Sequence, residues 1–334
     1  MKKGVNPVRA FGHQRGVALI TVLLVMVIAI AAVTHAIIRD QIAITRSGAL
    51  LANTQLAEFV GGAEAWARVA LEKDFEEDKA AADSADHALE AWAAPALQFN
   101  PDNGKIRINI KDLNSCFNVN TLHDGRDPNS AEFKILLQLV RNVTGKSDLA
   151  GAIADWVDTG DTPRSTATED DGYLGREMAH RTPDTLISDI SELSSVQGME
   201  AEDWQKLAPF LCALPESDTK ININLATREL IEAVDPAVDM AKLEQLRESD
   251  GILHDSGDLA DLNISKTTYF AFHSKYFIAR IAVQLGDTGD YRQYWETALW
   301  LDDSDGKAKV LQRQRRTFSL AMMQELLDGD DTRE

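Results

Sequence analysis

Residues 17–38 read VALITVLLVMVIAIAAVTHAII, a run of 22 residues without a formal charge. At about 1.5 Å per residue, a helix of this length spans roughly 33 Å, enough to cross the hydrocarbon core of a bilayer. Basic residues precede the run, and no acidic residue appears before Asp40. The positive-inside rule therefore predicts a single-pass membrane helix with residues 1–16 in the cytoplasm.

The remainder of the chain is acidic and has the composition of a folded protein. The 334 residues include 34 Lys or Arg and 53 Asp or Glu, for a net charge of −19, with 44% apolar residues. Such a charge argues against nucleic acid as the main partner, because binding to phosphates needs positive surface. The sequence contains no HExxH, GxSxG or Walker motif, so we expect no enzymatic activity.

The helix is predicted to continue beyond the apolar run. Apolar residues recur at a spacing of three or four, which is typical of one helical face: Leu56, Phe59, Val60, Ala63, Trp66 and Ala70. No proline interrupts this stretch. The acidic residues 72–94 show little apolar periodicity, and we interpret them as a solvated helix end and a loop without a functional site.

Alternation of apolar and polar residues predicts four strands, at 105–111, 277–285, 295–301 and 309–318. Gly/Asp-rich turns at 286–290 and 302–306 join the last three, which predicts an antiparallel meander. Between the first and second strands, helical patterns cover 131–143, 150–158, 187–196, 201–211 and 228–234. The predicted fold is therefore α+β, a long N-terminal helix packed on an antiparallel sheet, with an all-helical domain inserted in the sheet.

The residues at the start of the apolar run resemble a known processing signal. Gln14-Arg15-Gly16-Val17-Ala18-Leu19 is similar to the type IV prepilin leader, a basic segment that ends in Gly before an apolar helix. The resemblance implies that a prepilin peptidase cuts between Gly16 and Val17 and methylates the new N-terminus at Val17. A cleaved secretory signal peptide, a simple uncleaved anchor and a buried core helix are the alternatives.

One departure from the pilin pattern indicates which group of pilin-like proteins this chain resembles. Most pilin-like subunits carry Glu at the fifth mature position, where it is thought to pair with the N-terminal ammonium of a neighbouring subunit. Here that position is Thr21. The missing acid, the large insertion and the string GVALITVLLV together resemble the K subunits of the type II (general) secretion system, a family of minor pseudopilins.

This resemblance implies a function, partners and a location. It implies a subunit at the tip of a periplasmic pseudopilus that initiates or regulates assembly, so that folded proteins cross the outer membrane. The implied partners are the minor pseudopilins I and J, the major subunit, the inner-membrane assembly platform and the prepilin peptidase. The chain would be a single-pass inner-membrane protein with its bulk in the periplasm. The alternative is a signal-anchored periplasmic module that binds its partner with calcium.

We expect six segments from this reading of the chain. They are a prepilin leader (1–16), the transmembrane (17–38) and periplasmic (39–75) parts of the helix, a pilin-like sheet (76–118 and 270–318), the inserted helical domain (119–269) and an acidic tail (319–334).

Cys116 and Cys212 are the two cysteines of the chain. In an oxidising periplasm two thiols tend to pair, and the K family carries a comparable bridge. A disulfide is therefore predicted, and two separate buried thiols are the alternative.

Carboxylates are densest in residues 155–173, which we call the acidic loop. Six acids within 17 residues repel one another unless they are neutralised, and Ca²⁺, which takes six to eight oxygens, is the natural candidate. The loop resembles the family's calcium-binding segment. By that resemblance, Asp155 supports the site and the ligands are Asp158, Asp161, Glu169, Asp170 and Asp171.

Two segments of the insertion resemble each other. DLNSCFNVNT at 112–121 is similar to KININLAT at 220–227. The second also resembles the opening of helix-hairpin-helix modules, but the Gly-rich hairpin of those DNA-binding modules is absent. We expect the asparagines to satisfy backbone groups at turns and helix starts.

Overall fold

The structure is a computed structural model. It describes residues 15–81, 85–94, 97–124, 129–160, 163–164, 170–175, 179–249, 251–286, 291–319 and 326. The chain forms two compact units, 1–57 and 58–334. Helix α1 (Arg15–Ala81) begins in the first unit and ends in the second.

The first unit is helical throughout its described part, 15–57. An apolar window of α1 has a mean hydropathy of 2.6, and none of that window is buried within the protein. The absence of proline between residues 8 and 94 allows the backbone hydrogen bonds of α1 to continue without a break. This helix is long and apolar enough to cross a membrane.

The second unit is built around a five-stranded antiparallel sheet in the order β1-β2-β7-β8-β9. Its strands are β1 (Leu97–Phe99), β2 (Gly104–Asp112), β7 (Tyr276–Leu285), β8 (Tyr291–Asp302) and β9 (Lys307–Arg315). The four predicted strands and the antiparallel meander of β7, β8 and β9 are confirmed. So is the predicted hairpin turn at 302–306, while residues 287–290 lie outside the described part.

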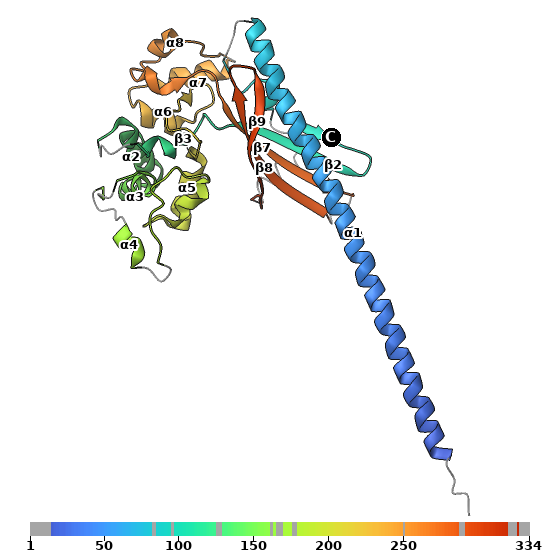
Figure 1. Ribbon diagram of the computed structural model, residues 1–334. Coiled ribbons are helices and arrows are strands. Elements are labelled where there is room, and N and C mark those ends of the chain that lie inside the picture. The colour runs from blue at the N-terminus through green and yellow to red at the C-terminus, as the bar shows by residue number, and fades with distance from the viewer. Residues whose placement is uncertain are drawn as a thin grey trace, which may run out of the picture. The chain divides into compact units, whose positions relative to one another are not determined.

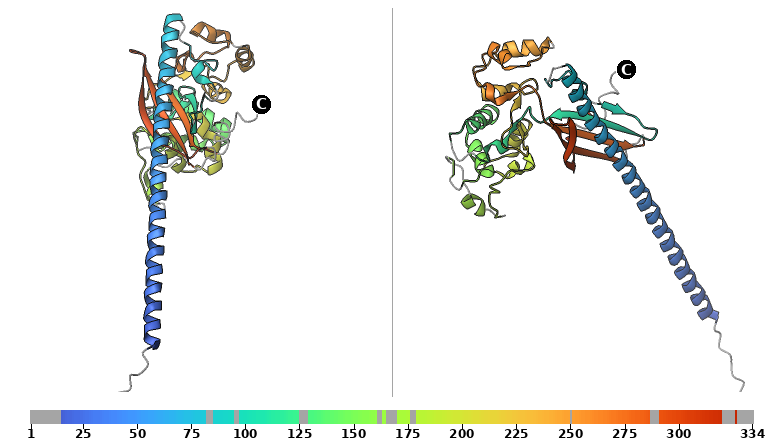
Figure 2. Two further views of the ribbon diagram at one scale, coloured as in Figure 1. Left: turned by 90° about the vertical axis from the view of Figure 1, so that its right-hand side faces the viewer. Right: turned by 45° about the horizontal axis from the view of Figure 1, so that its top comes forward.

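The part of α1 that belongs to the second unit packs on the sheet (Figures 1 and 2). Its buried side chains follow helical spacing and comprise Val60, Ala63, Ala67 and Leu71. Polar contacts fix the register, since Arg68 Nε donates to the carbonyl of Ala308 at 2.7 Å and Glu64 pairs with Arg313 at 2.5 Å. The predicted apolar face is confirmed at Val60 and Ala63, whereas Trp66 and Ala70 are half-exposed.

Helices occupy the chain between β2 and β7. They are α2 (Ala131–Thr144), α3 (Asp148–Val157), α4 (Asp170–Leu174), α5 (Ala201–Leu207), α6 (Arg228–Val234), α7 (Met240–Glu248) and α8 (Ser256–Asp261). A 3-10 turn, η1 (Ala91–Ala93), precedes β1. Four other 3-10 turns accompany the helices between β2 and β7, namely η2 (Val119–Leu122), η3 (Ile190–Ser195), η4 (Ala208–Phe210) and η5 (Thr267–Tyr269). One apolar core unites them.

The predicted helices lie where helical turns are found, but some of them differ from the structure in their ends or in the type of helix. The prediction for α6 is confirmed at both ends, and those for α2 and α3 are confirmed to within two residues. Residues 190–195 form a 3-10 turn instead of an α-helix, and α5 gives way to the 3-10 turn η4, which contains Pro209. Proline cannot donate the next backbone hydrogen bond, which accounts for that early end. Helices α4, α7 and α8 were not predicted.

Two short parallel bridges join distant parts of the second unit. Strand β3 (Phe117–Asn118) pairs with β4 (Leu211–Cys212), and β5 (Ile221–Asn222) pairs with β6 (Phe270–Ala271). The fold class predicted from the sequence, a long helix on an antiparallel sheet with additional helices, is confirmed. The six segment boundaries stay predictions.

Candidate functional site

The predicted processing positions lie in the first turn of α1. Gly16 and Val17 directly follow Arg15, where the helix begins, and the rest of the predicted leader lies outside the described residues. Cleavage and methylation there stay predictions. The fifth residue from Val17 is Thr21, which is exposed on α1, and its hydroxyl donates to the carbonyl of Ala18 at 2.9 Å. This hydroxyl is satisfied within its own helix, so Thr21 needs no polar partner in an apolar environment.

The first unit presents an apolar surface on α1. Large apolar side chains between residues 19 and 51 are exposed by 50 to 73%: Leu19, Ile20, Val22, Leu23, Leu24, Val25, Met26, Val27, Ile28, Ile30, Val33, Ile37, Ile38, Ile42, Ile44, Leu50 and Leu51. Exposed apolar surface of this extent marks a membrane or protein interface. The helix is therefore compatible with a single-pass membrane anchor.

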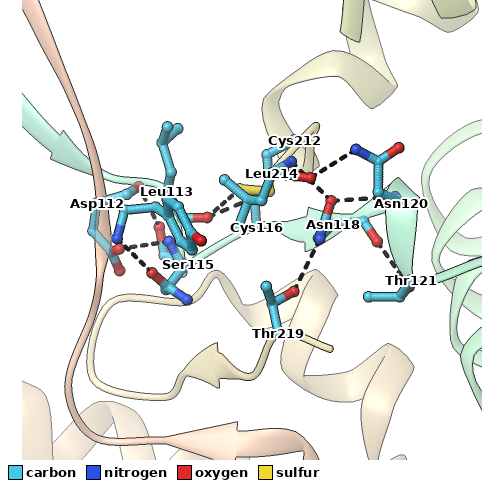
Figure 3. The surroundings of a disulfide bond; sticks show 12 residues. Asp112, Leu113, Ser115, Cys116, Asn118, Asn120, Thr121, Cys212, Leu214 and Thr219 are labelled. Atoms are coloured by element: carbon cyan, nitrogen blue, oxygen red, sulfur yellow. Dashed lines mark hydrogen bonds between the residues drawn. A yellow bond between two sulfur atoms is a disulfide. The ribbon is translucent and has the colours of Figure 1, made fainter. Parts of the chain in front are cut away.

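The predicted disulfide is present. Cys116 and Cys212 are bonded, with their Cα atoms 5.8 Å apart and a separation of 96 positions in the sequence (Figure 3). The bridge lies where β3 pairs with β4, because Asn118 is opposite Cys212 in that pairing. The two chain segments are thus joined both by backbone pairing and by a covalent bond.

The repeated asparagines act on the backbone, as expected. The Asn118 side chain accepts hydrogen bonds from the backbone N–H groups of Asn120 at 3.2 Å and Leu214 at 2.9 Å (Figure 3). In the second copy, Asn222 accepts from the N–H of Asn224 at 3.0 Å.

The second asparagine of each copy also pairs with backbone from a distant loop. Asn120 bonds both the N–H and the carbonyl of Ile187, and Asn224 bonds both groups of Leu253. All four asparagine side chains are therefore employed in holding the fold.

The acidic loop is neutralised in part by arginine, which the sequence reading did not anticipate. Asp155 lies in the last turn of α3, and Asp158 caps the end of that helix three residues later. Their side chains are buried, since the two residues are 1% and 3% exposed. Arg164 donates to Asp155 at 2.9 Å and also pairs with Asp158. Burial raises the pKa of Asp155 despite this cation. The Asp158 carboxylate also accepts from the N–H of Gly160 at 2.7 Å.

The remaining predicted calcium ligands divide into two groups. Asp170 begins α4, pairs with Arg181 and accepts from the N–H of Thr182 at 3.1 Å, while Asp171 beside it is exposed. Asp161 and Glu169 lie outside the described residues. Carboxylate oxygens are the correct donors for Ca²⁺. The donor set therefore fits calcium, although Arg164 and Arg181 already neutralise Asp158 and Asp170.

The acidic end of α1 is less solvated than expected, since Asp86 in the segment that follows the helix is only 6% exposed. Asp74, Asp78, Asp86 and Glu90, which we call the helix-end acids, each bring one carboxylate oxygen within 4.8 Å of the others. Burial and neighbouring carboxylates raise the pKa of Asp74 to about 7, of Asp86 to about 8 and of Glu90 to about 9. The i,i+4 spacing within each pair was visible in the sequence, but the return of residues 85–94 against the helix was not.

Comparison with known proteins adds a consistent result. A family model described as type II secretion system (T2SS), protein K matches residues 115–216, a span that includes both cysteines. Curated relatives with that name are similar over most of their length. One from Pectobacterium carotovorum subsp. carotovorum is 31% identical over 90% of this chain and 96% of its own. Another from Pseudomonas aeruginosa is 32% identical over 90% of this chain and 92% of its own.

A solved structure is similar in fold. It is a chain of the GspK-GspI-GspJ complex of the type 2 secretion system of enterotoxigenic Escherichia coli. It covers 82% of this chain and 100% of its own length, with a TM-score of 0.68 and 23% sequence identity. The fold of most of this chain is thus shared with a protein of known structure.

Proposed function

Since this chain belongs to the type II secretion system protein K family, we propose that it is a minor pseudopilin at the tip of the pseudopilus. In this position it initiates or regulates pseudopilus assembly, which exports folded proteins across the outer membrane. Its role is structural, not enzymatic. The observation that carries the proposal is Thr21, which stands where a fibre subunit carries an acid.

Thr21 supports a terminal position because its uncharged side chain cannot form an ion pair with a neighbouring subunit. A carboxylate within the apolar run is expensive in lipid unless it is paired, and a subunit inside a fibre can pair it with a neighbour's N-terminal ammonium. The Thr21 hydroxyl carries no charge and is already bonded to the carbonyl of Ala18. A subunit with nothing above it has no ammonium to pair, so a neutral residue suits the end of the fibre.

The partners follow from the surface of α1. The exposed apolar side chains of residues 19–51 need lipid or other helices around them. In lipid, close side-chain packing is the main source of helix association, so the helices of minor pseudopilins I and J are the fitting partners. The relative in the GspK-GspI-GspJ complex has this fold, which favours the same assembly here. The other proposed partners are the major pseudopilus subunit, the inner-membrane assembly platform and the prepilin peptidase.

The location follows from the charge pattern. Lys2, Lys3, Arg9 and Arg15 precede the apolar run, which favours a cytoplasmic N-terminus and a single pass through the inner membrane. The bulk of the chain is then periplasmic, an oxidising compartment in which the Cys116–Cys212 bond persists.

The acidic loop is proposed to hold structural calcium. The oxygen donors are the carboxylates of Asp158, Asp161, Glu169, Asp170 and Asp171, with Asp155 in support. Calcium would hold the segments before and after α4 together. For Asp158 and Asp170 to bind it, their present pairs with Arg164 and Arg181 must open.

The tip position is tested by adding the missing acid. We expect overproduction of the unaltered chain, as a tip subunit, to shorten pseudopili. We expect Thr21→Glu to let the subunit enter the fibre, so that its overproduction shortens them less. Thr21→Val, which removes the hydroxyl without adding charge, is the matched control and should behave as the unaltered chain. Pseudopilus length by electron microscopy is the measurement.

The intact mass of each variant, made with and without a prepilin peptidase, checks that processing is equal. We expect loss of residues 1–16 and gain of one methyl group only when the peptidase is present. Equal pseudopilus lengths for Thr21→Glu and the unaltered chain, at equal processing, would refute the tip assignment.

A further inference from the structure

The helix-end acids come from two segments of the second unit that face each other. Asp74 and Asp78 lie one turn apart on α1, and Asp86 and Glu90 lie in the segment that follows the helix. Four carboxylate oxygens, one from each residue, lie within 4.8 Å of one another. The acidic loop lies elsewhere in the chain and shares no residue with this group.

Neighbouring N–H groups fix two of these carboxylates. The indole Nε1 of Trp92 donates to Asp74 at 3.1 Å, and the backbone N–H of Ser274 donates to Asp86. Asp86 is 6% exposed, and its own N–H donates to the carbonyl of Phe272 at 2.8 Å. Such donors orient a carboxylate and favour its ionised form, as the outer partners of metal ligands do.

Glu90 provides an independent indication of a missing positive group. Its side chain is 8% exposed, and among the described residues its buried Oε2 has no hydrogen-bond partner. Its Oε1 lies 3.8 Å from His87 Nε2, which is longer than a hydrogen bond. A buried carboxylate oxygen without a donor is unfavourable, and here the carboxylate faces three others.

We propose that Asp74, Asp78, Asp86 and Glu90 bind a calcium ion at the end of α1. Calcium–oxygen distances of about 2.3 to 2.6 Å place opposite ligands up to about 5 Å apart, which suits the observed spread of the four oxygens. Magnesium needs a tighter, near-octahedral shell and retains more water. The group contains carboxylates but no histidine or cysteine, which disfavours zinc.

The surroundings provide access for the ion. A cavity of about 400 Å³ is lined by Asp74, Asp78 and Asp86, together with Ser274 and Asp303. Its volume accommodates the water molecules that would complete a shell of six to eight oxygens. The ion can therefore reach Asp74, Asp78 and Asp86 through this cavity without unfolding of the helix.

The bound ion would connect three elements of the second unit. Asp74 and Asp78 belong to α1, and Asp86 is held by backbone groups of residues 272 and 274, which directly precede β7. Calcium at this point would fasten the end of α1 to the approach to the sheet. This proposal does not depend on the tip position or on calcium binding by the acidic loop, so its test can give either result whatever the outcome for those two.

The test compares full-length protein in detergent, stripped with a chelator, before and after addition of about 1 mM CaCl₂, the concentration range of extracellular calcium sites. We expect calcium to raise the Tm of the unaltered chain. Glu90→Gln removes one of the four carboxylate ligands, so it should abolish most of the calcium-induced increase in Tm and weaken calcium binding at this site at least about tenfold by calorimetry.

Two variants separate this site from other effects. Glu77→Gln removes an acid that is 66% exposed on the same helix, and it should behave as the unaltered chain. Asp171→Asn alters the acidic loop and should leave the calcium effect of the helix-end acids in place. Unaltered calcium affinity in Glu90→Gln, or binding of zinc but not calcium, would overturn the proposal.

A spectroscopic measurement covers the case in which Glu90→Gln does not fold. Trp92 contacts Asp74, so it should transfer excitation to a terbium ion held by the helix-end acids. In the Asp171→Asn protein, we expect tryptophan-sensitised terbium emission that calcium displaces and that Trp92→Phe reduces severalfold. Emission that is absent, or that Trp92→Phe leaves unchanged, would contradict the site.

Discussion

Asp112 ends β2, and its carboxylate is buried where it accepts a hydrogen bond from the N–H of Asn114 at 2.6 Å. Burial raises its pKa from 3.8 to about 7. Between these values the unfolded chain is ionised at this residue while the folded chain retains the proton. Stability therefore falls as the pH rises from about 4 to about 7 and levels off above that, by at most about 1.4 kcal/mol per pH unit.

Asp112→Asn should remove this contribution, because the amide does not titrate and its oxygen can still accept from Asn114. We expect the variant to gain stability relative to the unaltered chain as the pH rises from 5 to 7. The difference in the free energy of unfolding between the two proteins can be measured by denaturant unfolding in chelator at several pH values. The helix-end acids titrate in both proteins. Asp112 also helps to raise the pKa of Asp86, so its loss acts on Asp86 in the same direction. Parallel pH profiles would contradict the prediction.

For single residues, the sequence predicted what a side chain does more reliably than which distant residue it contacts. The repeated asparagines could be assigned to backbone hydrogen bonding because their spacing and their turn-like context are local properties. The arginines that neutralise the acidic loop could not be assigned. Arg181 lies 11 positions from Asp170, and nothing in the sequence places that guanidinium beside that carboxylate.

Among the elements, the turn between β8 and β9 depends on Gly306. This residue has φ of +66°, and a Cβ added there would lie 2.5 Å from Cδ1 of Phe75 on α1. Glycine adopts positive φ without penalty and leaves room for the aromatic ring. The turn can therefore approach the helix closely enough for Lys307 to pair with Glu72 at 2.9 Å.

Gly306→Ala should destabilise the protein by roughly 1 to 3 kcal/mol through backbone strain, and further through the clash with Phe75. Gly286→Ala is the matched control, since Gly286 has φ of +68° but nothing within 4 Å of the added Cβ. Denaturant unfolding of both variants gives the comparison. Equal losses of stability would show that contact with Phe75 has no energetic weight.

Elements with strong periodicity were predictable, and short or polar ones were not. The strands β2, β7 and β8 alternate clearly, and α2 carries a regular apolar stripe that ends at Gly145 with φ of 75°. Helix α7 buries Met240 and Leu243 within the polar sequence MAKLEQLRE, too few apolar residues to form a stripe. Helices α4 and α8 span five and six residues, so little periodicity could develop.

For the whole molecule, the Cys116–Cys212 bond closes a loop that contains α2, α3, α4 and α5. In the chain-entropy model, a loop of this length contributes about 4 to 5 kcal/mol by restricting the unfolded chain. We expect the double variant Cys116→Ser, Cys212→Ser to unfold at a lower temperature than the oxidised protein.

Reduction of the unaltered protein should reproduce that shift, which serves as the control. Thermal unfolding with thiol counting is the measurement. An unchanged Tm in the double variant would mean that the β3–β4 pairing and the asparagine contacts suffice to hold these segments.

The topology was predictable in outline because the strand patterns were separated by about 150 residues of helical character. The convergence of the helix-end acids was not predictable. It depends on residues 85–94 turning back to place Trp92 against Asp74, and on Ser274 lying beside Asp86. Contacts between segments so far apart in sequence arise from tertiary packing, which local patterns do not encode.

The pairing of β2 with β7 also sets an order of events during biogenesis. β2 ends at Asp112 and β7 begins at Tyr276, so residues 113–275 must emerge before the central pair of the sheet can form. Until then the edge of β2 that receives β7 is open, and open edges invite pairing with other chains. Long-range pairing of this kind is slow to form. A chain that emerges from its N-terminus therefore spends most of its synthesis with an incomplete sheet, the interval in which other chains, chaperones and proteases can reach the open edge of β2.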